Sequence, residues 1–148
     1  MALKDFTLLA KLEELDLEGH KIVKRFEKSE KHVLSAEIRH TNAELLHLVI
    51  RAAKTQLEER RARKPLLGTR ELLWRADVEL EYLRLQVRKS FALRLINEKT
   101  YEEWSRLIRD CGGLLGAWLK KVNDGLIRTP ESRPAGGGQP AALQGRLL

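Results

Sequence analysis

TYEEWSRLIRDCGGLLGAWLKKVND, residues 100–124, is the stretch that decides the fold. Its apolar residues recur at spacings of three and four, the pattern of one buried face of an α-helix. They are Trp104, Leu107, Ile108, Cys111, Leu115, Trp118 and Val122. Thr100 and Glu103 have the spacing of a capping box, so we expect this helix to begin at Thr100. Asn123-Asp124-Gly125 is typical of a helix end, and the whole stretch predicts one long amphipathic helix.

Three earlier stretches have the same periodicity. The first spans Leu8 to Phe26, and the second runs from an expected cap at Ser29 to about Thr55. The third has Thr69 as its expected N-cap and continues toward Leu95. Because short breaks force neighbouring helices to be antiparallel, residues 1–124 predict an all-α, up-down-up-down four-helix bundle.

Two regions between and after these helices differ in composition. Residues 56–68 are dense in Arg, Lys and Glu and then contain Pro65 and Gly68, which predicts a mobile connector. Residues 125–148 are rich in Pro, Gly and Gln and cannot bury enough apolar surface to offset the entropy of ordering. We therefore expect a flexible, disordered C-terminal tail.

The composition indicates the class of partner and the compartment. The formal net charge is +7 over 148 residues, a positive field that attracts phosphates and makes nucleic acid the leading partner class. The alternative is that this charge serves solubility alone. One cysteine, Cys111, can form neither an internal disulfide nor a thiolate metal cage. No long apolar segment is present, so we expect a cytoplasmic protein without a membrane span.

Cations of the third predicted helix are the candidates for binding nucleic acid. They are Arg75, Arg84, Arg88, Lys89 and Arg94, and the basic cluster Arg60, Arg61, Arg63 and Lys64 extends the positive area. The cationic ends of Arg84, Arg88 and Lys89 can project together from one outer face and neutralise phosphates, and Arg75 and Arg94 extend the positive area. The alternative is a solvated, ion-paired face, because Glu81 can reach Arg84 and Asp77 lies one turn from Glu81 on the same helix.

Four other residues suggest close packing or contacts between subunits. Gly112 and Gly116 lie one turn apart inside a helix, where each Gly costs up to about 1 kcal/mol. Their spacing lets another backbone approach, either within the bundle or across a subunit interface. Trp74 and Tyr82 are more often rim or interface residues than platforms for stacking bases.

No pattern of residues indicates catalysis, a cofactor or a metal ion. The four histidines, His20, His32, His40 and His47, have no pair at a spacing of three or four that would bring two imidazoles to one ion. Arg25 and His32 have the separation found in helical-bundle ribonucleases of the HEPN class. The pair spans the predicted break between two helices, so we interpret the match as accidental. The sequence predicts a protein that is not an enzyme.

Two motifs resemble those of a known family. Residues 113–123, GLLGAWLKKVN, are similar to the closing motif of the accessory variability determinant (Avd) proteins of diversity-generating retroelements. Residues 82–88, YLRLQVR, resemble the basic helix of the same family, and the likeness extends over Leu8 to Asn123. The resemblance implies a four-helix protomer in a ring-shaped homopentamer, with Arg84 and Arg88 carrying the basic function. It also implies binding to the retroelement's reverse transcriptase and template RNA, in support of mutagenic cDNA synthesis by that enzyme.

Two alternatives remain open at this point. One is a related four-helix family that is encoded within intervening sequences of large ribosomal RNA genes. The other is a structural homo-oligomer without a role in nucleic-acid binding, which full ion pairing of the third-helix arginines would support.

Overall fold

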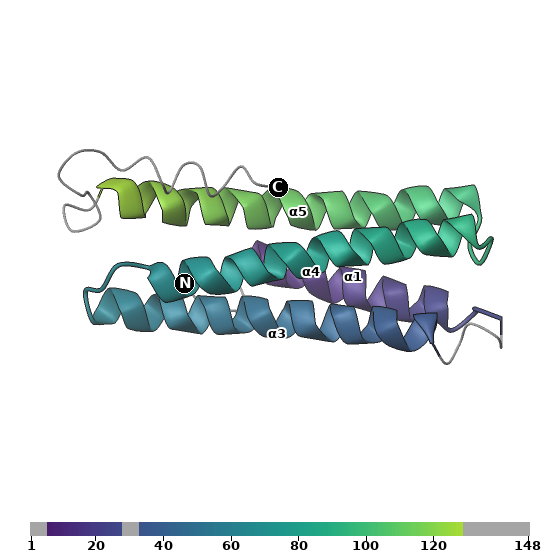
Figure 1. Cartoon of the computed structure of the whole chain (residues 1–148), viewed down its shortest axis with the longest axis horizontal. Coiled ribbons are helices and arrows are strands. Elements are labelled where there is room, and N and C mark those ends of the chain that lie inside the picture. Colours follow the sequence, from purple (N-terminus) through teal and green to yellow (C-terminus); the bar gives the residue numbers. More distant parts are fainter. Residues whose placement is uncertain (1–5, 28–32, 129–148) are drawn as a thin grey trace.

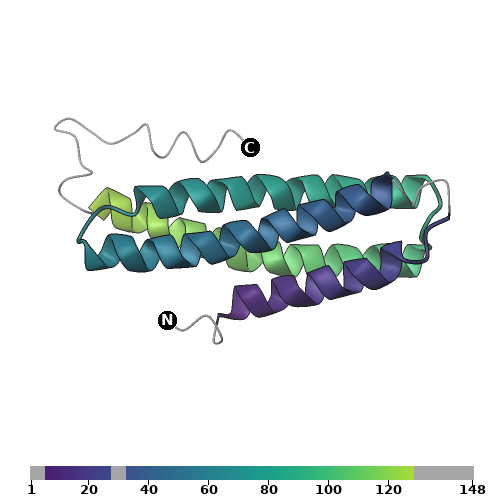
Figure 2. The ribbon, with the colours of Figure 1, turned by 90° about the horizontal axis from the view of Figure 1, so that it is seen from below.

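The computed structural model describes residues 6–27 and 33–128, and over these residues the chain forms four helices and no strand. The helices are α1 (Thr7–Val23), α3 (Leu34–Arg61), α4 (Leu67–Ala92) and α5 (Glu98–Arg128). Successive helices run in opposite directions (Figures 1 and 2). The main contacts join α1 to α3, α3 to α4, α4 to α5 and α5 back to α1. The predicted all-α class is confirmed. The predicted cap at Ser29 and the tail from residue 129 onward lie outside the described residues.

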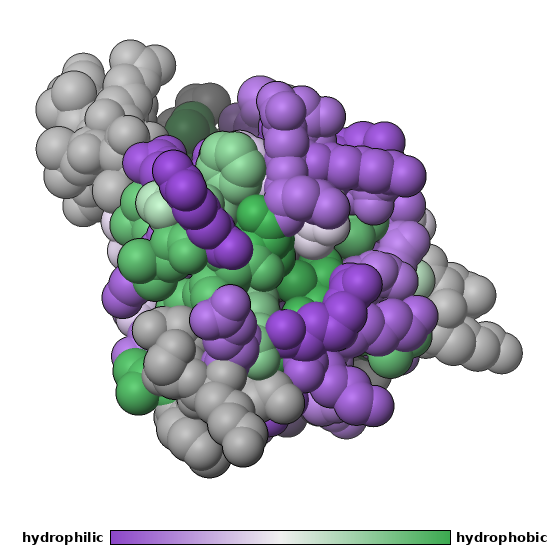
Figure 3. Space-filling model, turned by 90° about the vertical axis from the view of Figure 1, so that its right-hand side faces the viewer, coloured by the Kyte–Doolittle hydropathy of each residue, from purple (hydrophilic) through white to green (hydrophobic). Residues whose placement is uncertain are grey.

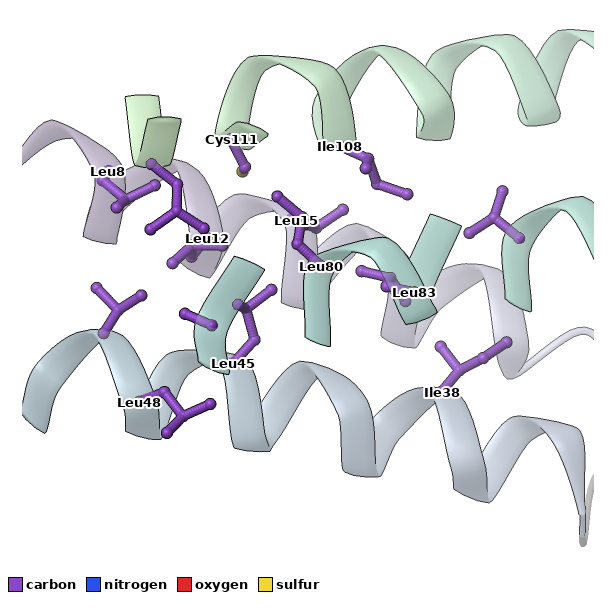
Figure 4. Close-up of a cluster of buried hydrophobic side chains, with 14 of the residues drawn as sticks. Leu8, Leu12, Leu15, Ile38, Leu45, Leu48, Leu80, Leu83, Ile108 and Cys111 are labelled. Carbon is purple, nitrogen blue, oxygen red and sulfur yellow. The ribbon is translucent and has the colours of Figure 1, made fainter. Parts of the chain in front are cut away.

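One apolar core runs along the axis of the bundle, with side chains from all four helices (Figure 4). The predicted stripes supply it, including Leu15, Leu45, Leu83 and Ile108, each at most 1% exposed. Trp118 departs from the prediction because it is only partly buried. Its Nε1 donates to Gln56 Oε1 at 2.8 Å, so this side chain joins α5 to α3 at the edge of the core.

Gly19 lies at a buried position of α1 where a side chain would crowd its neighbours. A Cβ atom at this position would lie 3.0 Å from Asn42 Nδ2 and 3.5 Å from the ring of Trp104. The first distance is tighter than most real Cβ contacts in a densely packed interior, so Asn42 would have to shift, whereas the second is an ordinary van der Waals contact. Gly19 on α1 therefore makes room for the amide from α3.

The turn between α3 and α4 differs from the predicted mobile connector. Residues 56–61 belong to α3, and α4 already begins at Leu67. Glu59 accepts hydrogen bonds from the backbone N–H of Gly68 at 2.8 Å, the N–H of Thr69 at 3.0 Å and the Thr69 hydroxyl at 2.6 Å. Prediction of Thr69 as the N-cap was wrong, because a carboxylate from the preceding helix satisfies the first donors of α4.

Helix α5 is longer at both ends than the sequence predicted. It begins at Glu98, and Asn97 Oδ1 accepts a hydrogen bond from the N–H of Thr100 at 2.8 Å, so Asn97 takes the capping role assigned to Thr100. It also continues through residues 123–125 to Arg128. The helix does not end at the predicted stop because Leu126 extends the buried stripe by one more turn.

Cys111 is buried in the core, as its place on the apolar stripe predicted. Burial, with a smaller contribution from Asp110, raises the pKa of the thiol from 9.0 to about 12. We expect iodoacetamide at pH 8 to label the folded protein far more slowly than the urea-unfolded chain, because the thiolate is the reactive form. Equal labelling rates would contradict this. The unfolded thiol ionises first, so the free energy of unfolding should fall as pH rises from about 9 toward 12.

Candidate nucleic-acid and subunit interfaces

Arg84 lies at the junction of α4 and α5 and is ion-paired. Its Nη1 is 3.4 Å from Glu81 Oε1, and both side chains are substantially exposed. Arg84 and Arg109 line a shallow surface pocket of about 450 Å³, together with Asp77 and Glu81. Arg84 therefore forms an ion pair, which is the alternative to phosphate binding. An exposed pair of this kind contributes little stability.

The carboxylates of this pocket offset its two arginines. Burial raises the pKa of Asp77, the neighbouring charge of Glu81 raises it further, and Arg84 acts in the opposite direction. Two carboxyl groups facing two guanidinium groups leave little net positive field for a phosphate. The pocket is therefore a poor anion site in the free protein.

The other candidate cations of α4 do not form one compact group. Arg88 and Lys89 are exposed and successive, so they point about 100° apart around the helix. Arg75 is exposed and lies thirteen residues before Arg88, roughly 20 Å along the axis. Arg94 is exposed beyond the end of α4, with a φ of 60°. Binding of nucleic acid by these residues stays a prediction.

An apolar stripe follows the outer face of α4, away from the core. Val78, Tyr82 and Leu85 are each more than 40% exposed, and Leu67 is 53% exposed at the start of the helix. Trp74 lies on the same face and is half-buried. An exposed apolar stripe of this length on one helix is typical of a surface that contacts another protein. It includes both aromatic residues that the sequence assigned to a subunit interface, and that role stays a prediction.

The two candidate glycines of α5 have different surroundings. A Cβ atom at Gly112 would lie 3.6 Å from Leu80 Cδ2 and 3.8 Å from Arg84 Nη2, so its close neighbour is α4 of the same chain. A Cβ atom at Gly116 would meet nothing within 4 Å, and Gly116 is exposed. Of the two, only Gly116 offers a free surface for a second subunit.

The described ranges contain no group of three or more His, Cys, Asp or Glu residues that could hold a metal ion. They also contain no helix both long and apolar enough to cross a membrane. His32 lies outside the described residues, so the structure does not test its pairing with Arg25.

Comparison with known proteins identifies the family. Residues 6–122 match the family model described as bAvd-like. The chain belongs to the bAvd-like family. The match begins just before α1 and ends within α5, so it covers α1, α3, α4 and most of α5 and confirms the resemblance to Avd proteins. This bAvd-like protein is accordingly an accessory protein of the Avd type, while no curated protein matches the chain at a significant level.

Proposed function

We propose that this bAvd-like protein is a non-catalytic accessory protein of a diversity-generating retroelement. It binds the element's reverse transcriptase and template RNA and supports mutagenic cDNA synthesis by that enzyme. The observation that carries the proposal is the family match, which extends over all four helices. A net charge of +7 supports binding to RNA, and the exposed apolar stripe of α4 supports contact with a protein.

An assay of cDNA synthesis by the reverse transcriptase tests this function directly. The enzyme and template RNA of one retroelement are combined with and without this protein, and the length and yield of cDNA are measured. We expect long cDNA products only when the protein is present, and we expect it to co-purify with the enzyme. Unchanged cDNA together with the absence of co-purification would contradict the proposal.

We also propose that the protein acts as a homo-oligomer and that the apolar stripe of α4 forms its subunit interface. Five copies of the 17.0 kDa chain would have a mass of about 85 kDa by light scattering. The double substitution Val78→Glu and Leu85→Glu should reduce the mass of the assembly, because burial of a charge in an apolar interface is strongly unfavourable. An unchanged mass in the double variant would place the subunit interface elsewhere.

A structural homo-oligomer that binds no nucleic acid is the second candidate function. The ion pair between Arg84 and Glu81 favours it, since this pair offsets one of the predicted phosphate ligands. Absence of RNA binding by the wild-type protein at low salt would support this candidate. The family match favours a retroelement protein over the ribosomal intervening-sequence type, and a neighbouring reverse transcriptase gene would separate those two possibilities.

A further inference from the structure

The net charge of the chain is concentrated at one end of the bundle. This end contains the α3–α4 turn and the last turns of α5, which lie together on the left in Figure 1. Its segments 48–76 and 115–128 contain 11 Lys and Arg residues and 4 Asp and Glu residues, a net charge of +7. The remaining described segments, 6–27, 33–47 and 77–114, contain 12 Lys and Arg residues and 14 Asp and Glu residues, a net charge of −2.

Four exposed cations crowd the turn itself: Arg60, Arg61, Arg63 and Lys64. None of them forms an ion pair with any described residue. The nearby carboxylate of Glu59 points inward to the first N–H groups of α4, which leaves Glu58 as the exposed carboxylate of the segment.

Helix α5 adds two further cations at the same end. Lys120 and Lys121 are exposed, and Lys120 is paired with Asp124 at 3.0 Å. The hydrogen bond from Trp118 to Gln56 joins α5 to α3 here, so these lysines belong to the same end of the bundle as the turn.

The backbone at the turn holds an arginine in a conformation that favours glycine. Arg63 has a φ of 55°, and α3 closes with hydrogen bonds from Lys64 N–H to the Glu59 carbonyl at 2.8 Å and from Arg63 N–H to the Arg60 carbonyl at 3.1 Å. In this helix-ending motif the residue with positive φ is usually Gly. An arginine here is less stable than Gly, and strained residues of this kind cluster at functional sites.

The opposite end of the bundle provides an internal comparison. Arg94 has a φ of 60° and closes α4 with the same pair of hydrogen bonds. The described segments outside the turn end, 6–27, 33–47 and 77–114, have a net charge of −2. Apolar side chains gather in the middle of this opposite end (Figure 3), and Val33 and Leu93, at helix ends there, are exposed. Positive φ alone therefore does not distinguish the two ends, whereas the surrounding charge does.

We infer that the α3–α4 turn end of the bundle is the surface that binds the phosphate backbone of the RNA. The cations that bind it are Arg60, Arg61, Arg63 and Lys64 of the turn, with Lys120 and Lys121 of α5 at the same end. This inference rests on the proposed function. The clustered, unpaired cations of the turn reinforce one another's field and can neutralise adjacent phosphates. Such contacts give affinity and position without reading the base sequence.

Two variants of equal charge test the inference. The turn variant is Arg60→Gln, Arg61→Gln, Arg63→Gly and Lys64→Gln. The control variant is Lys24→Gln, Arg39→Gln, Lys99→Gln and Arg106→Gln, four exposed cations that were not predicted to bind nucleic acid. Each variant lowers the net charge from +7 to +3 by removing four exposed cations. Circular dichroism and light scattering verify that both keep the fold and mass of the wild type.

Binding of a fluorescent single-stranded RNA of about 20 nucleotides is measured by anisotropy between about 50 and 200 mM salt. We expect the turn variant to lose at least about tenfold in affinity, with the slope against log salt falling by about 0.7 for each phosphate that is no longer neutralised. The control variant should stay within about threefold of wild type. An equal or larger loss of RNA affinity in the control variant, or no loss in the turn variant, would overturn the inference. The proposed function would still stand in that case, provided that the wild-type protein binds RNA.

Single substitutions separate binding from folding. Arg63→Gly should raise the midpoint of thermal unfolding and lower RNA affinity, so the loss of binding cannot come from a loss of folding. Failure of the wild type to bind RNA at any salt concentration would count against the proposed function itself. Competition by polyglutamate as strong as that by RNA would overturn the inference in favour of an acidic protein partner. A DNA strand of the same sequence shows whether the surface distinguishes the two backbones.

Discussion

Replacement of Trp104 by alanine is expected to lower the free energy of unfolding by about 3–5 kcal/mol, the usual range for removing a large buried aromatic side chain. Trp104 is 1% exposed and packs against the backbone of α1 at Gly19. The cavity left by the substitution is bounded on that side by helix backbone, which cannot move in to fill it. Urea unfolding followed by circular dichroism, at several protein concentrations, measures the change.

Trp104→Phe is the matched control for this prediction. Trp104 Nε1 is buried and has no hydrogen-bond partner among the described residues, so phenylalanine removes a donor whose burial is unfavourable. This partly offsets the lost volume, and we expect a decrease below about 1.5 kcal/mol. If Trp104→Ala lowered the free energy of unfolding no more than Trp104→Phe does, the indole would not be what stabilises the packing of α5 against α1.

Glu59→Ala is expected to destabilise the bundle by about 2–3 kcal/mol, more than the loss of an ordinary helix cap. The carboxylate accepts three hydrogen bonds, two of them from the backbone of Gly68 and Thr69 in the first turn of α4. Its negative charge also lies at the positive end of that helix. A Cβ atom at Gly68 would lie 3.0 Å from Glu59 Oε2, so this glycine is what allows the close approach.

Glu58→Ala is the control, since it removes the same charge from the next residue. Glu58 is exposed and forms no ion pair with a described residue, so its substitution should change stability by no more than about 0.5 kcal/mol. Glu59→Gln should fall between the two, because an amide oxygen still accepts but carries no charge. Equal effects of Glu58→Ala and Glu59→Ala would show that the carboxylate does not cap α4.

The ends of the helices were predicted less well than their buried faces. Apolar residues at helical spacing predicted the core, including Cys111. Thr69 and Thr100 both have the local signature of a cap, yet each lies inside a helix. At Thr100 the correct cap is three residues away in sequence, within reach of local reasoning. At Thr69 it is Glu59, ten residues away on another helix, which local patterns do not reveal.

By itself the sequence determined the number of helices and the face that each one buries. Periodicity in one chain carries this information, because burying apolar area is the dominant favourable term and is nearly independent of what lies opposite. Only the tertiary structure decided which helix ends meet. It brought the carboxylate of Glu59 to the start of α4 and gathered the cations of α3 and α5 at one end, since hydrogen bonds and fields between charges depend on distances that the packed bundle creates.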